Sequence, residues 1–163
     1  MLQAERYLEL TGLARGKMLD ASYQAAFYLL SCQTELFELG KKYVSLNGIY
    51  FAGMKRATGI QTLNDSNKQM IDIAHNLFSW SSKCKASPFD ISRLGYPYME
   101  LVCNAIFIAA GEYEVIIELD EQNKPKMILD TSHYQRTGRI HREMNQLYAR
   151  MLAGHSEEMG QER

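Results

Sequence analysis

The chain has 163 residues, a typical length for one domain or for one domain with an appendage. Apolar residues make up 46% of it and charged residues 23%, which are ordinary values for a globular protein with a sizeable core. The formal net charge of −1 excludes a global attraction to nucleic acid or to an anionic membrane, so a patch that binds either must be local.

The three cysteines, Cys32, Cys84 and Cys103, are odd in number and widely spaced. This pattern is typical of neither a disulfide framework nor a zinc site, so we expect reduced thiols. The first residues lack a basic-then-apolar signal pattern. No apolar run approaches the ~20 residues that a membrane-spanning helix needs. We therefore expect a cytoplasmic protein with no membrane partner.

The clearest predicted element is an amphipathic helix over residues 66–80. Ser66 and Gln69 fit a capping box at its start. Asp20 and Ser87 are expected N-caps of two further helices. Helices are also predicted over residues 20–30 and 98–110, and both are so apolar that we expect them to be buried on nearly all sides. In the helix predicted over residues 66–80, four apolar residues recur at the spacing of one helical face: Met70, Ile73, Ala74 and Leu77.

The pattern changes after Gly111. Two short apolar runs, 113–119 and 127–129, flank a polar loop and predict a β-hairpin. A last helix is predicted over residues 134–153. Its apolar stripe consists of Ile140, Met144, Leu147, Tyr148 and Met151.

These elements predict a mainly α fold, in which a compact helical domain is followed by a small C-terminal β-hairpin and a long helix. We expect a helical core domain over residues 1–112. The hairpin and C-terminal helix, 113–153, are expected to pack on that core, and residues 154–163 are expected to form a disordered tail.

No catalytic or metal-binding motif is recognisable. The histidines lack metal-ligand spacing, and the glycine patterns of nucleophile elbows, phosphate-binding loops and dinucleotide sites are missing from the sequence. His75, three residues after Asp72, is interpreted as a structural histidine, with an unfamiliar enzyme site as the alternative. The basic segment 55–59 has the wrong residue order for a phosphate cradle and is a weak candidate for an anion site. We expect no cofactor, no metal and no enzymatic activity.

An acidic run surrounds the predicted hairpin. Glu112, Glu114 and Glu118 share strand parity, so a strand would place them on one face. The simplest interpretation is a solvated surface. The alternative is an acidic surface that imitates the phosphates of a nucleic acid.

The last helix carries a basic stripe beside its apolar one. Arg136, Arg139 and Arg142 are spaced by three residues, and Arg150 follows two turns later. Arginines in this arrangement suit phosphates or the acidic side chains of a partner. The alternatives are a helix that only keeps its charges in water, a protein-binding surface and a nucleic-acid-binding surface.

Five short segments carry a shared pattern, namely residues 23–30, 47–51, 73–78, 87–90 and 104–106. Together they resemble an uncharacterised domain-of-unknown-function family of short helical proteins from Gram-positive bacteria and their mobile elements. The resemblance covers about residues 2–112 and implies a helical fold. It implies no catalytic or binding residues, because the family has none assigned.

Our leading functional prediction is a non-enzymatic protein-interaction module that acts through the part of the chain outside this resemblance. The mobile-element association implies, in its sharpest form, an inhibitor or adaptor acting on a host defence nucleoprotein such as a CRISPR-type nuclease. One alternative is a nucleic-acid-binding regulator that uses the basic C-terminal helix. Another is an enzyme with a site near His75.

Overall fold

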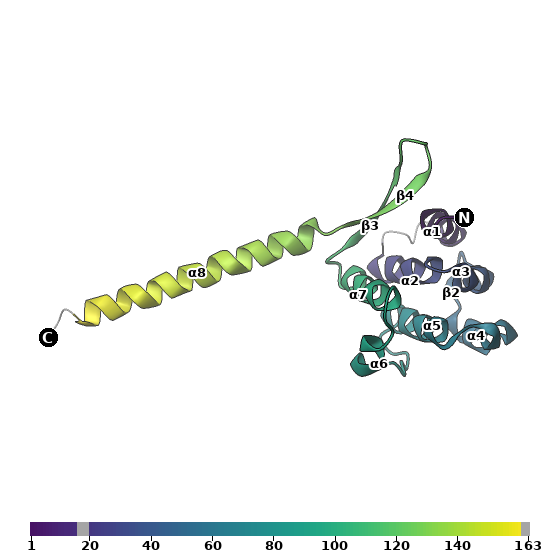
Figure 1. Ribbon diagram of the computed structural model, residues 1–163, viewed down its shortest axis with the longest axis horizontal. Helices are drawn as coiled ribbons and strands as arrows, with labels where there is room; N and C mark the ends of the chain where they lie inside the picture. The colour runs from purple at the N-terminus through teal and green to yellow at the C-terminus, as the bar shows by residue number, and fades with distance from the viewer. Residues whose placement is uncertain (16–19, 161–163) are drawn as a thin grey trace. The chain divides into compact units, whose positions relative to one another are not determined.

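The computed structural model describes residues 1–15 and 20–160, with side chains described as far as residue 154. This part of the chain is mainly helical, and a small antiparallel hairpin precedes a long final helix (Figure 1), so the expected fold class is confirmed. The α-helices are α1 (Gln3–Ala14), α2 (Ala21–Ser31), α3 (Thr34–Gly40), α4 (Phe51–Arg56), α5 (Asp65–Phe78), α6 (Pro88–Ser92), α7 (Tyr98–Ala109) and α8 (Ser132–Gly160). The shorter elements are the 3-10 helices η1 (Lys41–Tyr43) and η2 (Thr58–Thr62) and the strands β1 (Val44–Ser45), β2 (Gly48–Ile49), β3 (Glu114–Leu119) and β4 (Pro125–Asp130).

Helix α2 lies at the centre of the helical body. Asp20 caps its start by accepting a hydrogen bond from the Ser22 amide at 2.7 Å, as expected. Every residue from 24 to 31 is buried, because α2 packs against α1, α3, α5, α7 and β3 (Figure 1). Apolar residues on all sides of a helix are typical of a buried helix, so the expected deep burial of this segment is confirmed.

Helix α7 is covered on only one side. Val102, Ala105 and Ile108 are fully buried where α2 and α5 meet the helix. Met99 and Ile106 are exposed. The expectation that 98–110 is buried all round is therefore wrong, since its neighbours leave one face of this apolar helix open.

Helix α5 forms where the amphipathic pattern predicts, with Met70, Ile73 and Ala74 buried. Its N-cap is Asn64, whose side chain accepts a hydrogen bond from the Asn67 amide at 2.7 Å. The predicted capping box at Ser66 and Gln69 is therefore wrong, because the helix begins at Asp65 and both residues lie inside its first turns. Trp80, expected at the end of this helix, lies beyond it and is 93% exposed.

The predicted hairpin forms as β3 and β4, paired antiparallel so that Ile116 faces Ile128 and Glu118 faces Lys126. Its inner face packs on the core through Val115, Ile117, Met127 and Leu129. The Gln24 side chain on α2 accepts a hydrogen bond from the Val115 amide at 3.1 Å. The hairpin is therefore joined to the helical body by both apolar contact and a polar tether.

The chain divides into two compact units, Met1–Asp130 and a second unit that starts at Thr131. The hairpin belongs to the first unit, so this division falls after Asp130, whereas the sequence suggested a boundary after residue 112. In the second unit α8 runs to Gly160, past the expected helix end at residue 153. Residues 154–160 of the expected disordered tail are thus helical, and residues 161–163 lie outside the described part. The expected packing of α8 on the core stays a prediction.

A buried arginine joins α1 to the C-terminal end of α2. Arg6 is only 8% exposed, and its guanidinium donates hydrogen bonds to the carbonyls of Ser31 at 2.6 Å, Cys32 at 3.2 Å and Met1 at 2.6 Å. The last carbonyls of a helix have no partner within the helix, and they form its negative end. Arg6 therefore satisfies carbonyls that would otherwise be buried without partners.

We predict that Arg6→Ala lowers the free energy of unfolding by about 2–3 kcal/mol, because it leaves buried carbonyls at the end of α2 without donors. Equilibrium urea denaturation measures the change. Arg93→Ala is the matched control, since Arg93 is exposed and its guanidinium lies over the face of the Phe89 ring; its effect should stay below about 1 kcal/mol. Equal losses in the two variants would contradict the structural role of Arg6.

We also predict that Gly138→Ala stabilises α8 locally. Glycine inside a helix costs roughly 0.5–1 kcal/mol relative to alanine, and a β-carbon at this position would lie 3.5 Å from Arg142 Nη1, an ordinary contact. Hydrogen exchange of the α8 amides should slow roughly two- to fivefold. Gly12→Ala makes the same exchange in α1, where a β-carbon meets no atom within 4 Å. It should leave the α8 amides unchanged, and no slowing in Gly138→Ala would refute the prediction.

Candidate functional site

The apolar stripe of α8 is exposed to solvent. Leu147 and Met151 are 59% and 56% exposed, and Ile140 and Met144 are close to half exposed. Their spacing of four, three and four residues places them on one face of the helix. In the described part of its unit, α8 is the only helix or strand, so no second element of that unit covers this face. We call these four residues the α8 stripe.

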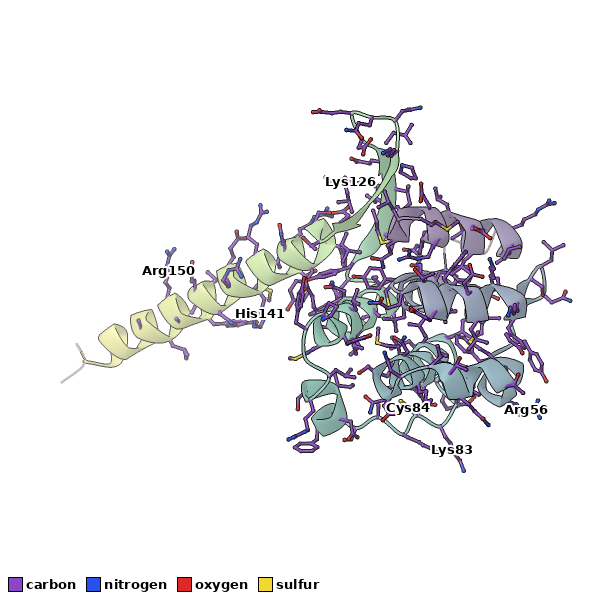
Figure 2. All side chains as sticks on the ribbon, turned by 45° about the vertical axis from the view of Figure 1, so that its right-hand side comes forward. Arg56, Lys83, Cys84, Lys126, His141 and Arg150 are labelled. Atoms are coloured by element: carbon purple, nitrogen blue, oxygen red, sulfur yellow. The ribbon has the colours of Figure 1, made fainter. Side chains whose placement is uncertain are left out.

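The four predicted arginines all lie exposed on α8. With about 100° of rotation per residue, Arg136 borders the α8 stripe, Arg150 and Arg139 lie about a quarter turn from its centre, and Arg142 lies on the opposite side of the helix. Arg150 and His141 point to opposite sides of α8 in Figure 2, which fits this rotation. Positive charge therefore flanks part of the apolar face, and the use of these arginines in binding stays a prediction.

The structure brings together only two of the three predicted acidic residues. Glu114 and Glu118 lie exposed on the outer face of β3, separated by Ile116. Glu112 precedes the strand, in the turn after α7, so it does not belong to this face by strand parity. Lys126 faces Glu118 across the hairpin, and this opposing charge interrupts the acidic surface (Figure 2).

His75 packs against an aromatic ring. Its imidazole stacks on Phe51 with the ring centres 4.8 Å apart. Burial, followed by the positive charge of Lys55, holds the pKa of His75 below its ordinary value, while Asp72 acts in the opposite direction. This stacking fits the structural interpretation of His75.

Asp72 connects three segments of the helical body. From α5, its carboxylate accepts hydrogen bonds from the Lys55 ammonium on α4 and from the Lys85 backbone amide at 2.7 Å. Burial alone would raise the pKa of Asp72, but the hydrogen bonds from Lys55 and Lys85 outweigh it, and the pKa lies below its ordinary value. Asp72 therefore fixes the connection between α5 and α6 against the body.

Beside Asp72 lies a surface hollow of about 490 Å³ that the sequence did not reveal. It is bordered by α4, η2, α5 and the connection to α6, on which Figure 2 labels Lys83 and Cys84. Four lysines and two aspartates line it, an excess of two positive charges. We call it the lysine hollow, and its charged residues are Lys55, Lys68, Lys83, Lys85, Asp72 and Asp90.

Both aspartates of the lysine hollow are engaged within the protein. Asp72 holds Lys55 and the Lys85 amide. Asp90 accepts hydrogen bonds from the Ser87 hydroxyl at 2.6 Å and the Ser87 amide at 2.8 Å, which complete the helix cap predicted at Ser87 and lower the pKa of Asp90. Lys83 and Lys85 form no ion pair with any carboxylate in the described part of the chain.

Only Lys55 of the basic segment 55–59 lines the lysine hollow, and the use of this segment as an anion site stays a prediction. The Arg56 guanidinium instead donates hydrogen bonds to the Tyr50 hydroxyl at 2.8 Å and to the Ala52 carbonyl at 3.0 Å. Lys55 and Lys85 are 30 positions apart, so no local sequence motif signals the cluster. The nearest signal was the polar run at 81–87, which carries two lysines.

No protein-family model, curated protein or solved structure matches this chain. The resemblance to the mobile-element family therefore stays a prediction. None of the helices in the described residues combines the length and apolarity needed to cross a membrane. The described side chains also include no group of three histidine, cysteine or acidic residues arranged to hold a metal ion. The three cysteines are free thiols, and burial raises the pKa of Cys32 to about 12.

We predict that Asp72 contributes stability that depends on pH. Its pKa in the folded protein lies below the unfolded value, so the contribution is present above about pH 4 and is lost as the pH falls through the folded pKa. Relative to Asp72→Asn, the wild type should be more stable at pH 7, and this difference should shrink between about pH 5 and pH 3. Urea denaturation at each pH measures it.

Asp65→Asn is the control for this experiment, since the Asp65 carboxylate is solvent-exposed and 3.6 Å from Lys68. Its difference from the wild type should be small throughout. A wild-type advantage over Asp72→Asn that stays constant with pH would contradict an ion-paired Asp72.

Proposed function

We propose that this chain is a non-enzymatic protein-interaction module that binds its partner through the α8 stripe. The observation that carries the proposal is the exposure of four large apolar side chains along one face of a helix. Burying such a face on a partner removes apolar surface from water, at roughly 25 cal/mol per Å². A helix packed into a groove or against another helix is a recurrent mode of recognition that uses this spacing.

The charge of α8 indicates the chemistry of the partner. Between residues 132 and 154 the helix carries four arginines and one glutamate, Glu143, whereas Glu157 and Glu158 follow near its C-terminal end. The positive charge is therefore concentrated in the part of α8 that carries the stripe, where it attracts an acidic surface. We therefore propose a different protein as the partner, with an acidic border around an apolar groove or helix face. The resemblance to mobile-element proteins makes a host defence nucleoprotein, such as a CRISPR-type nuclease, the first class to test as the target of an inhibitor or adaptor.

The four exposed arginines favour a second candidate function, a nucleic-acid-binding regulator. Arg139 and Arg142 lie away from the α8 stripe, so they remain free for phosphates when the stripe is covered. Phosphate binding predicts an affinity that falls steeply as salt rises.

We predict that Met144→Ser/Leu147→Ser weakens partner binding at least about tenfold, or about 1.4 kcal/mol, because it removes two central apolar contacts. The tagged full chain first captures partners from host lysate, and titration with each purified partner then measures the dissociation constant. Gln146→Ser/Ala149→Ser is the matched control, with two exposed substitutions on the opposite side of α8. It should bind like the wild type.

Three outcomes would overturn this proposal. The first is wild-type affinity of the stripe variant for the captured partner. The second is a dimer in sedimentation that the stripe variant dissociates, since that result assigns the stripe to self-association. Binding of DNA or RNA that is lost in Arg139→Gln/Arg142→Gln and kept in the stripe variant would support the nucleic-acid regulator instead.

A further inference from the structure

The lysine hollow lies in the first unit and is independent of the function proposed for α8. It concentrates like charges from distant parts of the chain. Lys55 comes from α4, Lys68 from α5, and Lys83 and Lys85 from the connection between α5 and α6. Ammonium groups around one concave surface repel one another, and a bound anion relieves that repulsion.

The carboxylates of the lysine hollow do not neutralise all of its ammonium groups. Asp72 binds one ammonium, that of Lys55, and uses its second oxygen for the Lys85 backbone amide. Asp90 is occupied by the cap of α6. Lys68 lies 3.6 Å from Asp65, a carboxylate on its own helix that is almost fully exposed. The excess of two positive charges thus stays open to a ligand.

The connection that carries Lys83 and Lys85 is held in place before any ligand arrives. Asp72 anchors the Lys85 amide at 2.7 Å, and the Asn76 side chain donates a hydrogen bond to the Ser82 carbonyl at 2.8 Å. Both anchors are on α5. A segment fixed in this way loses less conformational entropy on binding than a free loop does.

A further polar group at the lysine hollow lacks a partner. Gln69 lines the hollow, and its buried amide oxygen has no hydrogen-bond partner among the described residues. A buried acceptor without a partner costs about 1–3 kcal/mol. Ile60 and Ala86 add an apolar part to the lining.

We propose that the lysine hollow binds the phosphate group of a phosphorylated ligand. Lys83 and Lys85 supply the unpaired charges, Lys68 supports them, and Lys55 stays with Asp72. Lysine binds phosphate as a point charge without fixed geometry, which suits lysines that line one hollow from separate segments. A volume of about 490 Å³ is in the usual range for small-molecule pockets, so a small phosphorylated molecule such as a nucleotide fits it.

The test uses the full chain at low salt with three probes, namely pyrophosphate, ATP and a single-stranded oligonucleotide of about 12 nucleotides. Isothermal titration measures affinity, and amide chemical shifts of Gln69 and Lys85 report the place of binding. Emission of Trp80, the only tryptophan and five residues before Lys85, gives an independent readout. We expect saturable binding of at least one probe, with shifts at both amides.

Lys83→Gln/Lys85→Gln should weaken this binding at least about tenfold and leave the thermal unfolding midpoint unchanged, because neither side chain is ion-paired. Lys124→Gln/Lys126→Gln on the hairpin removes the same charge at two exposed positions and should bind like the wild type. Binding of pyrophosphate or ATP assigns the site to a small molecule, and binding of the oligonucleotide alone assigns it to a nucleic-acid backbone. The proposal is overturned if no probe binds, or if the two double variants lose affinity equally.

Discussion

The burial of α2 is the constraint on which the helical body depends. A helix with eight successive buried residues needs neighbours on every side, and α1, α3, α5, α7 and β3 take these places. Apolar packing alone would leave those neighbours free to slide. Polar tethers fix them, since the Asn104 side chain on α7 donates to the Tyr28 hydroxyl at 3.1 Å and Arg6 binds the end of α2. Breaking either tether lowers the free energy of unfolding, because it leaves a buried polar group without a hydrogen-bond partner.

Local patterns in the sequence predict most of this fold. The caps at Asp20 and Ser87, the amphipathic face of α5 and the hairpin all depend on residues within a few positions of one another, where propensity and periodicity act. The error on α7 has a different origin. Its composition matches that of a helix buried all round, but burial depends on how many neighbours reach it, and Ile106 faces water because none does. The division of the chain after Asp130 likewise depends on contacts that the hairpin makes with α2.

The two candidate surfaces differ in how far the sequence reveals them. The arginines and apolar residues of α8 follow helical spacing, so the sequence predicts their arrangement directly. The lysine hollow is assembled from α4, α5 and an irregular connection, and its geometry is set by one carboxylate. Asp72 has no distinctive sequence context, and its role is apparent only once Lys55 and the Lys85 amide are seen to converge on it.

Helix α8 gains little stability from its own sequence. Gly138 weakens its interior, and in proteins most helical stability comes from the packing of an apolar face. A partner that covers the α8 stripe therefore stabilises the helix while it binds. The entropy cost of ordering the helix offsets part of the binding free energy that such a partner supplies. This cost lowers the affinity per unit of buried area. The first unit does not share this dependence, because its core is complete around α2. The chain thus combines a first unit that has its own apolar core with a helix whose apolar face no other element of its unit covers in the described residues.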